Sequence, residues 1–180
     1  ADSLRVLVLR DPLTWEQRPE AETGLEFELL ERYARWAKLK LKVVPVDHSD
    51  SLLLWLQQGR GDVAAAQLDP NSPKKRFIAF SKPYQQVAPV LVALRADPLT
   101  RKARRKGEQA PDTVLLSRWS PFERATLDLA PRNGVKPVLY TSYGTPEEVL
   151  VDVVLGPRPG AVISDAAAMT ESKRFPHLSF

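Results

Sequence analysis

GDVAAAQLDPNSPKKRFIAFSKPY, residues 61–84, is the stretch that decides the fold. It begins with the apolar run Val63 to Ala66, which is typical of a buried strand, and continues into a polar loop with two prolines. The cations Lys74 to Arg76 follow, and an apolar and aromatic segment then ends at Pro83 and Tyr84. A strand whose carboxyl end runs into such a loop is suited to hold a small acidic group. The alternative interpretation is a tight turn with a solvated basic face.

This segment resembles the matching part of the type 3 periplasmic solute-binding family. The family pattern has Gly-x-x-Asp, a short apolar strand, Thr-Pro-Glu-Arg, a spacer and Phe-Ser-x-Pro-Tyr. Phe80 to Tyr84 matches the last part in full, whereas Asn71 to Lys74 matches Thr-Pro-Glu-Arg only loosely. The resemblance covers residues 4–95 by motif and residues 112–175 by the order of the expected elements.

One branch of the family is particularly similar. The apolar strand at 4–9, the Asp-Pro-Leu-Thr-Trp run at 11–15 and the Gly-Leu-x-x-Glu-Leu start at 24–29 resemble the N-terminal, non-catalytic domain of the membrane-bound lytic transglycosylase F group. The resemblance therefore implies a two-lobed α/β fold of the periplasmic-binding-protein type (type II). It also implies that the family's return to lobe one would begin near where this sequence ends, so we expect a truncated form of that fold.

Composition agrees with an ordinary globular protein. The chain has 180 residues, is 43% apolar and contains no uninterrupted apolar run as long as the ~18 residues of a membrane span. We recognise no signal peptide and interpret the sequence as a mature or trimmed form. Because cysteine is absent, disulfides, thiol catalysis and cysteine metal sites are excluded.

The positive charge is concentrated in one cluster. The net charge is +4, but RKARRK at 101–106 carries five positive charges, so the rest of the chain sums to −1. The simplest interpretation is an exposed basic helix or loop. The functional alternative is contact with anionic lipid or the acidic wall polymer through Arg101, Lys102, Arg104, Arg105 and Lys106. Nucleic acid is disfavoured, because no aromatic residue is interleaved to stack on bases.

Strand and helix patterns alternate along the chain, which favours α/β layers with parallel sheets. We expect lobe one at 1–95 and lobe two at 96–180, with a boundary region at 96–111. The expected strands are 4–9, 41–46, 63–66, 86–95, 113–117, 135–140 and 161–164. The expected helices are 24–38, 50–58, 121–129, 146–155 and 166–173, and Ser120-Pro121 and Thr145-Pro146 provide capping starts for two of them.

The tryptophans and one helical stripe divide into core and site candidates. In the helix at 24–38, the residues Leu25, Leu29, Tyr33 and Trp36 form an apolar stripe that we expect to face the core, and Leu30, Ala34 and Ala37 widen it. Trp36 and Trp55 lie on helices and are predicted to be core residues. Trp15 and Trp119 lie in loops and are predicted to face a ligand, because aromatic rings in clefts stack on sugars or apolar groups.

In open α/β sheets, ligands bind beyond the carboxyl ends of the strands. That rule selects the segments 11–15, 67–74, 117–120 and 164–165. By the resemblance, these segments line the cleft between the lobes. The predicted ligand-binding residues are Trp15, Gln67, Asp69, Lys74, Arg118, Trp119, Ser120 and Asp165.

The resemblance also implies individual roles. Lys74 stands where the family arginine binds a ligand α-carboxylate, Ser120 where a threonine assists, and Asp165 where an aspartate binds the α-ammonium. Lysine cannot bind a carboxylate bidentately as arginine does, and Asp69 stands where the family prefers a small hydroxyl donor. These departures favour a larger or differently charged ligand. Two structural alternatives are that Asp165 is a helix N-cap and that Ser120 only caps its helix.

Motifs of catalysis are nearly absent. The sequence has neither a phosphate-binding glycine loop nor Gly-x-Ser-x-Gly, and only His48 and His177 are available as histidine ligands, so we expect no metal and no cofactor. Glu171-Ser172 faintly resembles the catalytic Glu-Ser start of lytic transglycosylases, but the expected downstream segment does not follow it. We interpret Glu171 as a residue of the helix surface.

The resulting hypothesis is a non-catalytic, periplasmic, monomeric sensor or regulatory domain. It would close around a cell-wall-derived peptide or amino-acid-like ligand and could regulate an attached lytic transglycosylase. An amino-acid-binding component of an ABC transporter is one alternative. Another is a small-acid dehydratase on the same fold, with Asp69 or Asp165 as its general acid. A third is a wall or lipid adhesion module that depends on the basic cluster.

Overall fold

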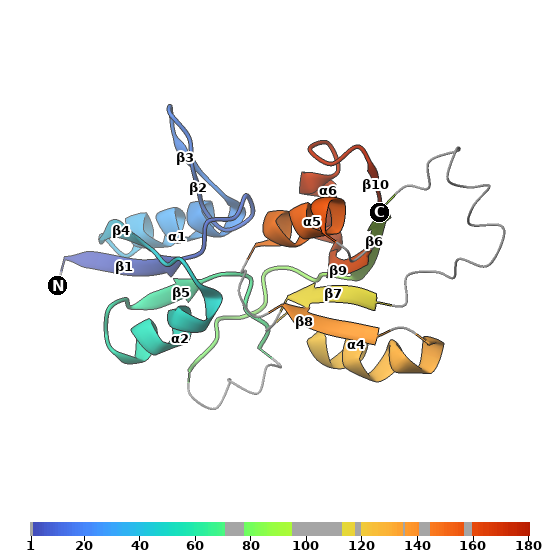
Figure 1. Ribbon diagram of the computed structural model, residues 1–180. Helices are drawn as coiled ribbons and strands as arrows, with labels where there is room; N and C mark the ends of the chain where they lie inside the picture. The colour runs from blue at the N-terminus through green and yellow to red at the C-terminus, as the bar shows by residue number, and fades with distance from the viewer. Residues whose placement is uncertain are drawn as a thin grey trace. The chain divides into compact units, whose positions relative to one another are not determined.

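The computed structural model describes residues 2–70, 78–94, 113–117, 120–134, 136–140, 145–156 and 160–180. The described chain forms two compact units. The first unit extends to Leu68, and Thr145 groups with it, whereas the second unit takes up the chain at Asp69 and contains the remaining described residues. Figure 1 shows the elements of both units, and each unit is described separately below.

The first unit is built on a three-stranded parallel sheet in the order β4 (Lys40–Pro45), β1 (Ser3–Val8), β5 (Val63–Ala65). Helices α1 (Leu25–Trp36) and α2 (Ser49–Gln57) flank this sheet (Figure 1). The central strand is covered on both faces, because its alternating side chains belong to two core clusters. The α1 side contains Leu4, Val6, Val8, Trp15, Phe27, Ala34 and Ala65, and the α2 side contains Leu7, Leu9, Val46 and Leu52.

A small hairpin, which the sequence patterns did not predict, interrupts the path from β1 to α1. It consists of β2 (Glu16–Gln17) and β3 (Glu22–Thr23), which pair in antiparallel fashion. The Arg18 amide donates to the Ala21 carbonyl at 2.9 Å, and the Arg18 guanidinium forms an ion pair with Glu16 at 2.7 Å. The two strands are too short to give a recognisable alternation, so the hydrophobic pattern alone could not reveal them.

Helix α1 forms where predicted, but the prediction of its buried face was only partly right: Ala34 is buried and Leu30 packs against the core, whereas the main stripe is exposed. The buried residues of the helix are Glu26, Phe27 and Ala34, whereas Trp36 is 79% exposed. The rest of the predicted stripe is also exposed: Leu25, Leu29 and Tyr33. The amides of Glu26 and Phe27 donate to the carbonyls of Leu13 and Thr14, both at 3.1 Å. These bonds fix the rotation of the helix about its axis and turn Phe27 toward the core.

The burial of Trp55 on α2 agrees better with the prediction of a core residue than that of Trp36 does. Its side chain is half-buried and packs against the cluster on the α2 side of the sheet. The Arg60 guanidinium lies over its ring, 4.4 Å from the ring centroid. Trp55 is therefore a residue of the core margin, covered on its outer side by a cation.

The second unit contains a mixed five-stranded sheet, not the purely parallel sheet that we expected. Its order is β10 (Leu178–Ser179), β6 (Pro89–Leu94), β9 (Gly160–Ser164), β7 (Thr113–Ser117), β8 (Lys136–Tyr140). Strand β7 runs parallel to β8 and β9, whereas β6 is antiparallel to β9 and β10. Its described helices are α4 (Glu123–Leu129), the 3₁₀ turn η2 (Pro131–Asn133), α5 (Pro146–Leu155) and α6 (Asp165–Glu171).

The division between the units differs from the lobe boundary expected from the sequence. We placed residues up to 95 in lobe one, but β6 pairs along its length with β9, from Pro89 opposite Ser164 to Ala93 opposite Gly160. This ladder ties the segment after Leu68 to the second unit. The proposed boundary region at 96–111 lies outside the described residues. The predicted boundary rested on a polar segment in the local composition. The sheet to which β6 belongs depends instead on its long-range pairing with β9.

The helix starts show which capping predictions succeed. Helix α5 begins at Pro146 as predicted, but α4 begins at Glu123, two residues later than expected. Ser120 therefore does not cap α4 directly; its hydroxyl accepts a hydrogen bond from the Phe122 amide at 3.2 Å. Ser164 is the N-cap of α6, and its hydroxyl accepts from the Ala167 amide at 3.1 Å. The proposed N-cap role of Asp165 is therefore wrong.

Gly24 gives a direct test of how α1 is held. Its backbone has φ +138°, and a Cβ built there would lie 2.3 Å from the Thr14 carbonyl oxygen. Gly24→Ala should therefore lower the free energy of unfolding by on the order of 3 kcal/mol, measured by urea denaturation.

Gly59→Ala is the matched control. Gly59 has φ +68° with nothing within 4 Å of the added Cβ, so it isolates the conformational cost, which is about 1 kcal/mol. Equal losses for the two variants would contradict the close contact between Gly24 and the loop.

Candidate functional site

The candidate site lies at the carboxyl-terminal edge of the parallel sheet in the first unit. In the sheet register, Val8 at the end of β1 stands opposite Ala65 at the end of β5. The loop after β1 carries Asp11, and Gln67 follows β5 by two residues. Because parallel strands end at the same edge, these two loops emerge side by side, which is where the rule for open α/β sheets places a ligand.

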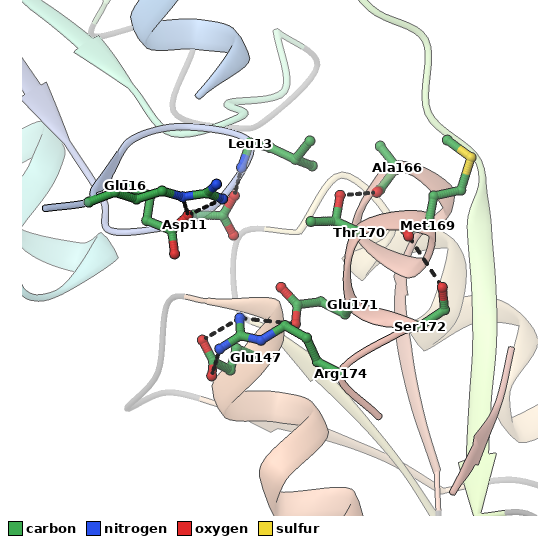
Figure 2. A network of polar contacts seen from close by, with 11 residues as sticks. Asp11, Leu13, Glu16, Glu147, Ala166, Met169, Thr170, Glu171, Ser172 and Arg174 are labelled. Atoms are coloured by element: carbon green, nitrogen blue, oxygen red, sulfur yellow. Dashed lines mark hydrogen bonds and ion pairs between the residues drawn. The ribbon is translucent and has the colours of Figure 1, made fainter. Parts of the chain in front are cut away.

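Asp11 organises the first of these loops. Its carboxylate Oδ1 accepts a hydrogen bond from the Leu13 amide at 2.8 Å, a contact drawn in Figure 2. Its carbonyl accepts from the amides of Thr14 at 3.0 Å and Trp15 at 2.8 Å. An aspartate that accepts from the backbone two residues later forms an Asx turn. The turn holds the carboxylate in place although Asp11 is only 6% exposed.

Gln67 connects this loop to helix α1. Its backbone amide donates to both carboxylate oxygens of Glu26, at 3.0 and 3.1 Å. Its side-chain Nε2 donates to Asp11 Oδ1 at 3.0 Å. Gln67 therefore links two buried carboxylates, one from the β1 loop and one from the first turn of α1. Its φ of +51° lies in the left-handed region, which is uncommon for a residue other than glycine.

The environment of Asp11 favours its protonated form. Burial raises the pKa of the Asp11 carboxyl from its ordinary value of 3.8 to about 6, and the nearby charge of Glu26 acts in the same direction. The hydrogen bonds from the amides of Leu13 and Thr14 and from Gln67 lower this pKa and oppose the shift only in part. The result is a desolvated carboxylate beside a second acid, an arrangement that a positive charge would stabilise.

Thr14 adds a further polar group to this loop. It is 1% exposed, and its hydroxyl is buried with no hydrogen-bond partner within the described part of the chain. Buried polar groups are nearly always hydrogen-bonded, so an exception at this position is informative. The Thr14 hydroxyl is a donor and acceptor that the described chain does not use.

Trp15 is placed differently from the prediction. It is 3% exposed and belongs to the core cluster on the α1 side of the sheet. Its Nε1 donates to Glu22 at 3.0 Å, and the Arg10 guanidinium lies 6.0 Å from its ring centroid. The expectation of a ring face open to a ligand is therefore corrected. Trp15 packs the loop against the sheet, because its indole lies in one core cluster with Phe27 and the β1 residues Val6 and Val8.

Asp165 in the second unit has a structural partner. Its carboxylate Oδ1 accepts from the amides of Ala88 at 3.1 Å and Ala166 at 2.8 Å, and its own amide donates to the Ala88 carbonyl at 2.9 Å. These bonds join the start of α6 to the segment that enters β6. Asp165 and Ser120 are half-buried. Their predicted contact with a ligand stays a prediction.

The remaining predicted site residues divide into two groups. Asp69 is described and half-buried, and its ligand contact stays a prediction. Lys74, Arg118 and Trp119 lie outside the described residues, as do the five cations of the basic cluster. Within the described chain, no group of three or more potential ligands could hold a metal ion. No helix in the same residues is long and apolar enough to cross a membrane.

Glu171 is not on the helix surface, so our interpretation of it was wrong. It is 1% exposed and forms an ion pair with Arg174 at 3.4 Å. Arg174 also binds Glu147 of α5 through two hydrogen bonds, at 2.7 and 3.1 Å. Figure 2 shows Arg174 between these two carboxylates. The cluster joins the end of α6 to the start of α5.

Comparison with known proteins identifies the family. The model of the bacterial extracellular solute-binding proteins, family 3, matches residues 4–147. The chain belongs to this family. A membrane-bound lytic murein transglycosylase F of Pseudomonas fluorescens is 38% identical over 90 residues, which is 49% of this chain and 18% of that relative. The matched segment thus spans less than a fifth of this relative's length.

Solved structures support the same α/β fold. An ancestral arginine-binding protein bound to arginine matches with a TM-score of 0.78 and 20% identity, over 99% of this chain and 78% of that one. The BvgS VFT2 domain of Bordetella pertussis matches with a TM-score of 0.77 and 24% identity, over 99% and 74%. In the described residues of this chain, the loops that carry Asp11 and Gln67 form the candidate ligand site.

Sequence reasoning found Gln67 and the loop that contains Asp11, but it missed Glu26. One signal was present in the sequence. At 100° per residue, Glu26 and Leu30 are about 40° apart around the helix axis. Phe27 and Ala34 lie on the same side of the helix. An acid on the apolar side of a helix indicates a buried polar partner. We did not use this signal, because we expected the stripe through Leu25 and Trp36 to be the buried side of the helix.

The raised pKa of Asp11 predicts the pH dependence of stability. A carboxyl with a higher pKa in the folded protein contributes stability that is fully present below about pH 4 and is lost as the pH rises through about 6. The difference between the two pKa values corresponds to on the order of 2–3 kcal/mol. Asp11→Asn should remove this part of the pH dependence, measured by urea denaturation from about pH 3.5 to about pH 7.5, a range that includes both pKa values.

Asp62→Asn provides the control for this measurement. Hydrogen bonds from Arg5 lower the pKa of Asp62, so its contribution has the opposite sign and is lost as the pH falls. Asp62 is exposed, and its effect should be small. A pH profile of Asp11→Asn that coincides with the unmodified chain would show that Asp11 is not held in the described environment.

Proposed function

We propose that this chain is a non-catalytic, small-solute-binding domain and that a positively charged group of its ligand docks on Asp11. The observation that carries the proposal is the buried Asp11 carboxylate at the end of β1, hydrogen-bonded to Gln67 and close to a second acid. Membership of the solute-binding family supports capture of a small molecule. The charge of the site supports the choice of a cationic group.

The physical argument is electrostatic. Burial has removed most of the water around Asp11, and the hydrogen bonds from Leu13 and Gln67 compensate only part of that loss. An ammonium or guanidinium group that reaches Asp11 favours the ionised form and supplies a charge-assisted hydrogen bond. An anionic group would instead meet the carboxylates of Asp11 and Glu26. The site therefore distinguishes ligands by charge before it distinguishes them by shape.

The finer identity of the ligand and the setting belong to the same proposal. We infer a cell-wall-derived peptide or an amino-acid-like ligand in the periplasm, bound by a domain that regulates an attached lytic transglycosylase. The similarity of about half of the chain to a membrane-bound lytic murein transglycosylase F supports this setting. Lys74, Asp69, Ser120 and Asp165 are proposed as further ligand contacts, and so are Arg118 and Trp119. The basic cluster is a proposed contact with the membrane or wall.

A second candidate is an amino-acid-binding component of a transporter. The resemblance in fold to an arginine-binding protein favours it, because a guanidinium is one of the groups that suits Asp11. The two candidates differ in ligand size, since a transporter component would take a free amino acid and the regulatory domain a peptide fragment of the wall.

Isothermal titration with four probes separates these possibilities: L-arginine, L-glutamate, a muropeptide stem peptide with a free amino group, and the same peptide N-acetylated. The full 180-residue chain should bind arginine or the free-amine peptide and should bind neither the acetylated peptide nor glutamate. Asp11→Asn should weaken the observed binding at least about tenfold, because it removes a buried charged partner.

Gly59→Ala serves as a folded control with an unchanged site. If the folded chain gives no heat with any of the four probes, the proposal fails. If the acetylated peptide binds as well as the free-amine peptide, the chain binds a ligand but Asp11 does not bind its cationic group.

A further inference from the structure

Glu26 has a location that its sequence position does not suggest. It stands in the first turn of α1, where acidic residues are usually exposed and interact with the helix dipole. Here it is 7% exposed, and both of its carboxylate oxygens accept from the Gln67 amide. Its own backbone amide donates to the Leu13 carbonyl at 3.1 Å. Glu26 therefore contacts the loop after β1 through its backbone and the loop after β5 through its side chain.

These contacts explain the unusual backbone of Gln67. A left-handed conformation is unfavourable for a residue with a Cβ, so it persists only where the surroundings determine it. The bifurcated hydrogen bond to Glu26 holds the Gln67 amide in that conformation. The side chain then extends so that its Nε2 lies 3.0 Å from Asp11 Oδ1. Glu26 thus acts on Asp11 through Gln67 and, in addition, through its own charge.

We propose that Glu26 is a positioning and specificity-determining residue of the ligand site: it holds Gln67 against Asp11 and places a second negative charge behind Asp11. The inference rests on the proposed function, because it concerns the site at which the ligand would bind. Glu26 does not touch the ligand itself; it acts on the ligand through Gln67 and Asp11. Its charge makes the site favour a cationic group over a neutral group of the same shape.

A purely structural role for Glu26 predicts a different experimental result. If Glu26 only anchored α1 to the sheet, its replacement would change stability and leave the charge preference of the site unaltered. The two roles separate in the carboxyl titration of Asp11, because Glu26 raises the pKa of Asp11 through its charge. They also separate in the ratio of affinities for a charged ligand and its neutral counterpart, since that ratio does not depend on stability.

The test compares Glu26→Gln with Glu28→Gln in the full chain. Glu28 lies in the same first turn but is exposed, so its substitution removes the same charge away from the site. Carbon-13 NMR titration should show that Glu26→Gln lowers the pKa of Asp11 toward its ordinary value. The ratio of affinities for L-arginine and the neutral L-citrulline should fall by about fivefold or more, as loss of one nearby charge predicts. Glu28→Gln should leave both values unchanged.

Glu26→Asp tests positioning separately from charge. It keeps the carboxylate on a shorter side chain, so the Gln67 amide resonance should shift while the arginine preference is largely retained. An unchanged Asp11 titration and an unchanged affinity ratio in Glu26→Gln would overturn the inference. If Glu26→Gln fails to fold, the Glu26→Asp variant decides, and an unmoved Gln67 amide in it overturns the positioning role.

Failure of the proposed function gives a different result. A folded, unmodified chain that binds neither arginine nor citrulline defeats ligand docking at Asp11. The Asp11 titration and the Gln67 amide shift need no ligand, so in that case they still report whether Glu26 positions these two residues.

Discussion

The first unit depends on the docking of the first turn of α1 against the loop that follows β1. The amides of Glu26 and Phe27 donate to the carbonyls of Leu13 and Thr14, and the absence of a side chain at Gly24 permits the close approach. Helix starts leave amides without partners inside the helix, so these carbonyls act as the cap. The same two bonds set the helix rotation, bury Phe27, and bring the Glu26 carboxylate to Gln67.

This dependence shows why part of the fold could be predicted and part could not. The strands β1, β4 and β7 and helix α5 follow local signals, namely short apolar runs and a proline-led helix start, and they appear close to where the sequence placed them. The buried face of α1 follows a long-range contact instead. An apolar stripe through Leu25 and Trp36 was available, but two backbone hydrogen bonds turned the helix away from it. Pairing of β6 with β9 is likewise invisible to a local pattern.

The candidate site divides in the same way. The rule that ligands bind beyond the carboxyl ends of parallel strands selected Gln67 and the loop of Asp11, because it requires only the strands and their order. It could not reveal Glu26, which reaches the site from a helix. It also could not distinguish a loop residue that faces outward from one that packs inward, so Trp15 was assigned to a ligand although its indole fills the core.

The charge of the site makes sense of the departures from the family pattern. The resemblance assigns a ligand carboxylate to the position of Lys74, but Asp69 stands nearby in sequence and lysine lacks the bidentate geometry of arginine. The described acids favour a cationic ligand group instead, since Asp11 and Glu26 are both buried and the pKa of Asp11 is raised. Two buried acids cost free energy unless a positive charge compensates them. A ligand that offers a cation to Asp11 relieves this cost, whereas a ligand that offers only a carboxylate increases it. The proposed selection of a ligand by its positive charge therefore fits the departure at Lys74, because a ligand whose carboxylate is absent or blocked in a peptide bond does not need a bidentate arginine.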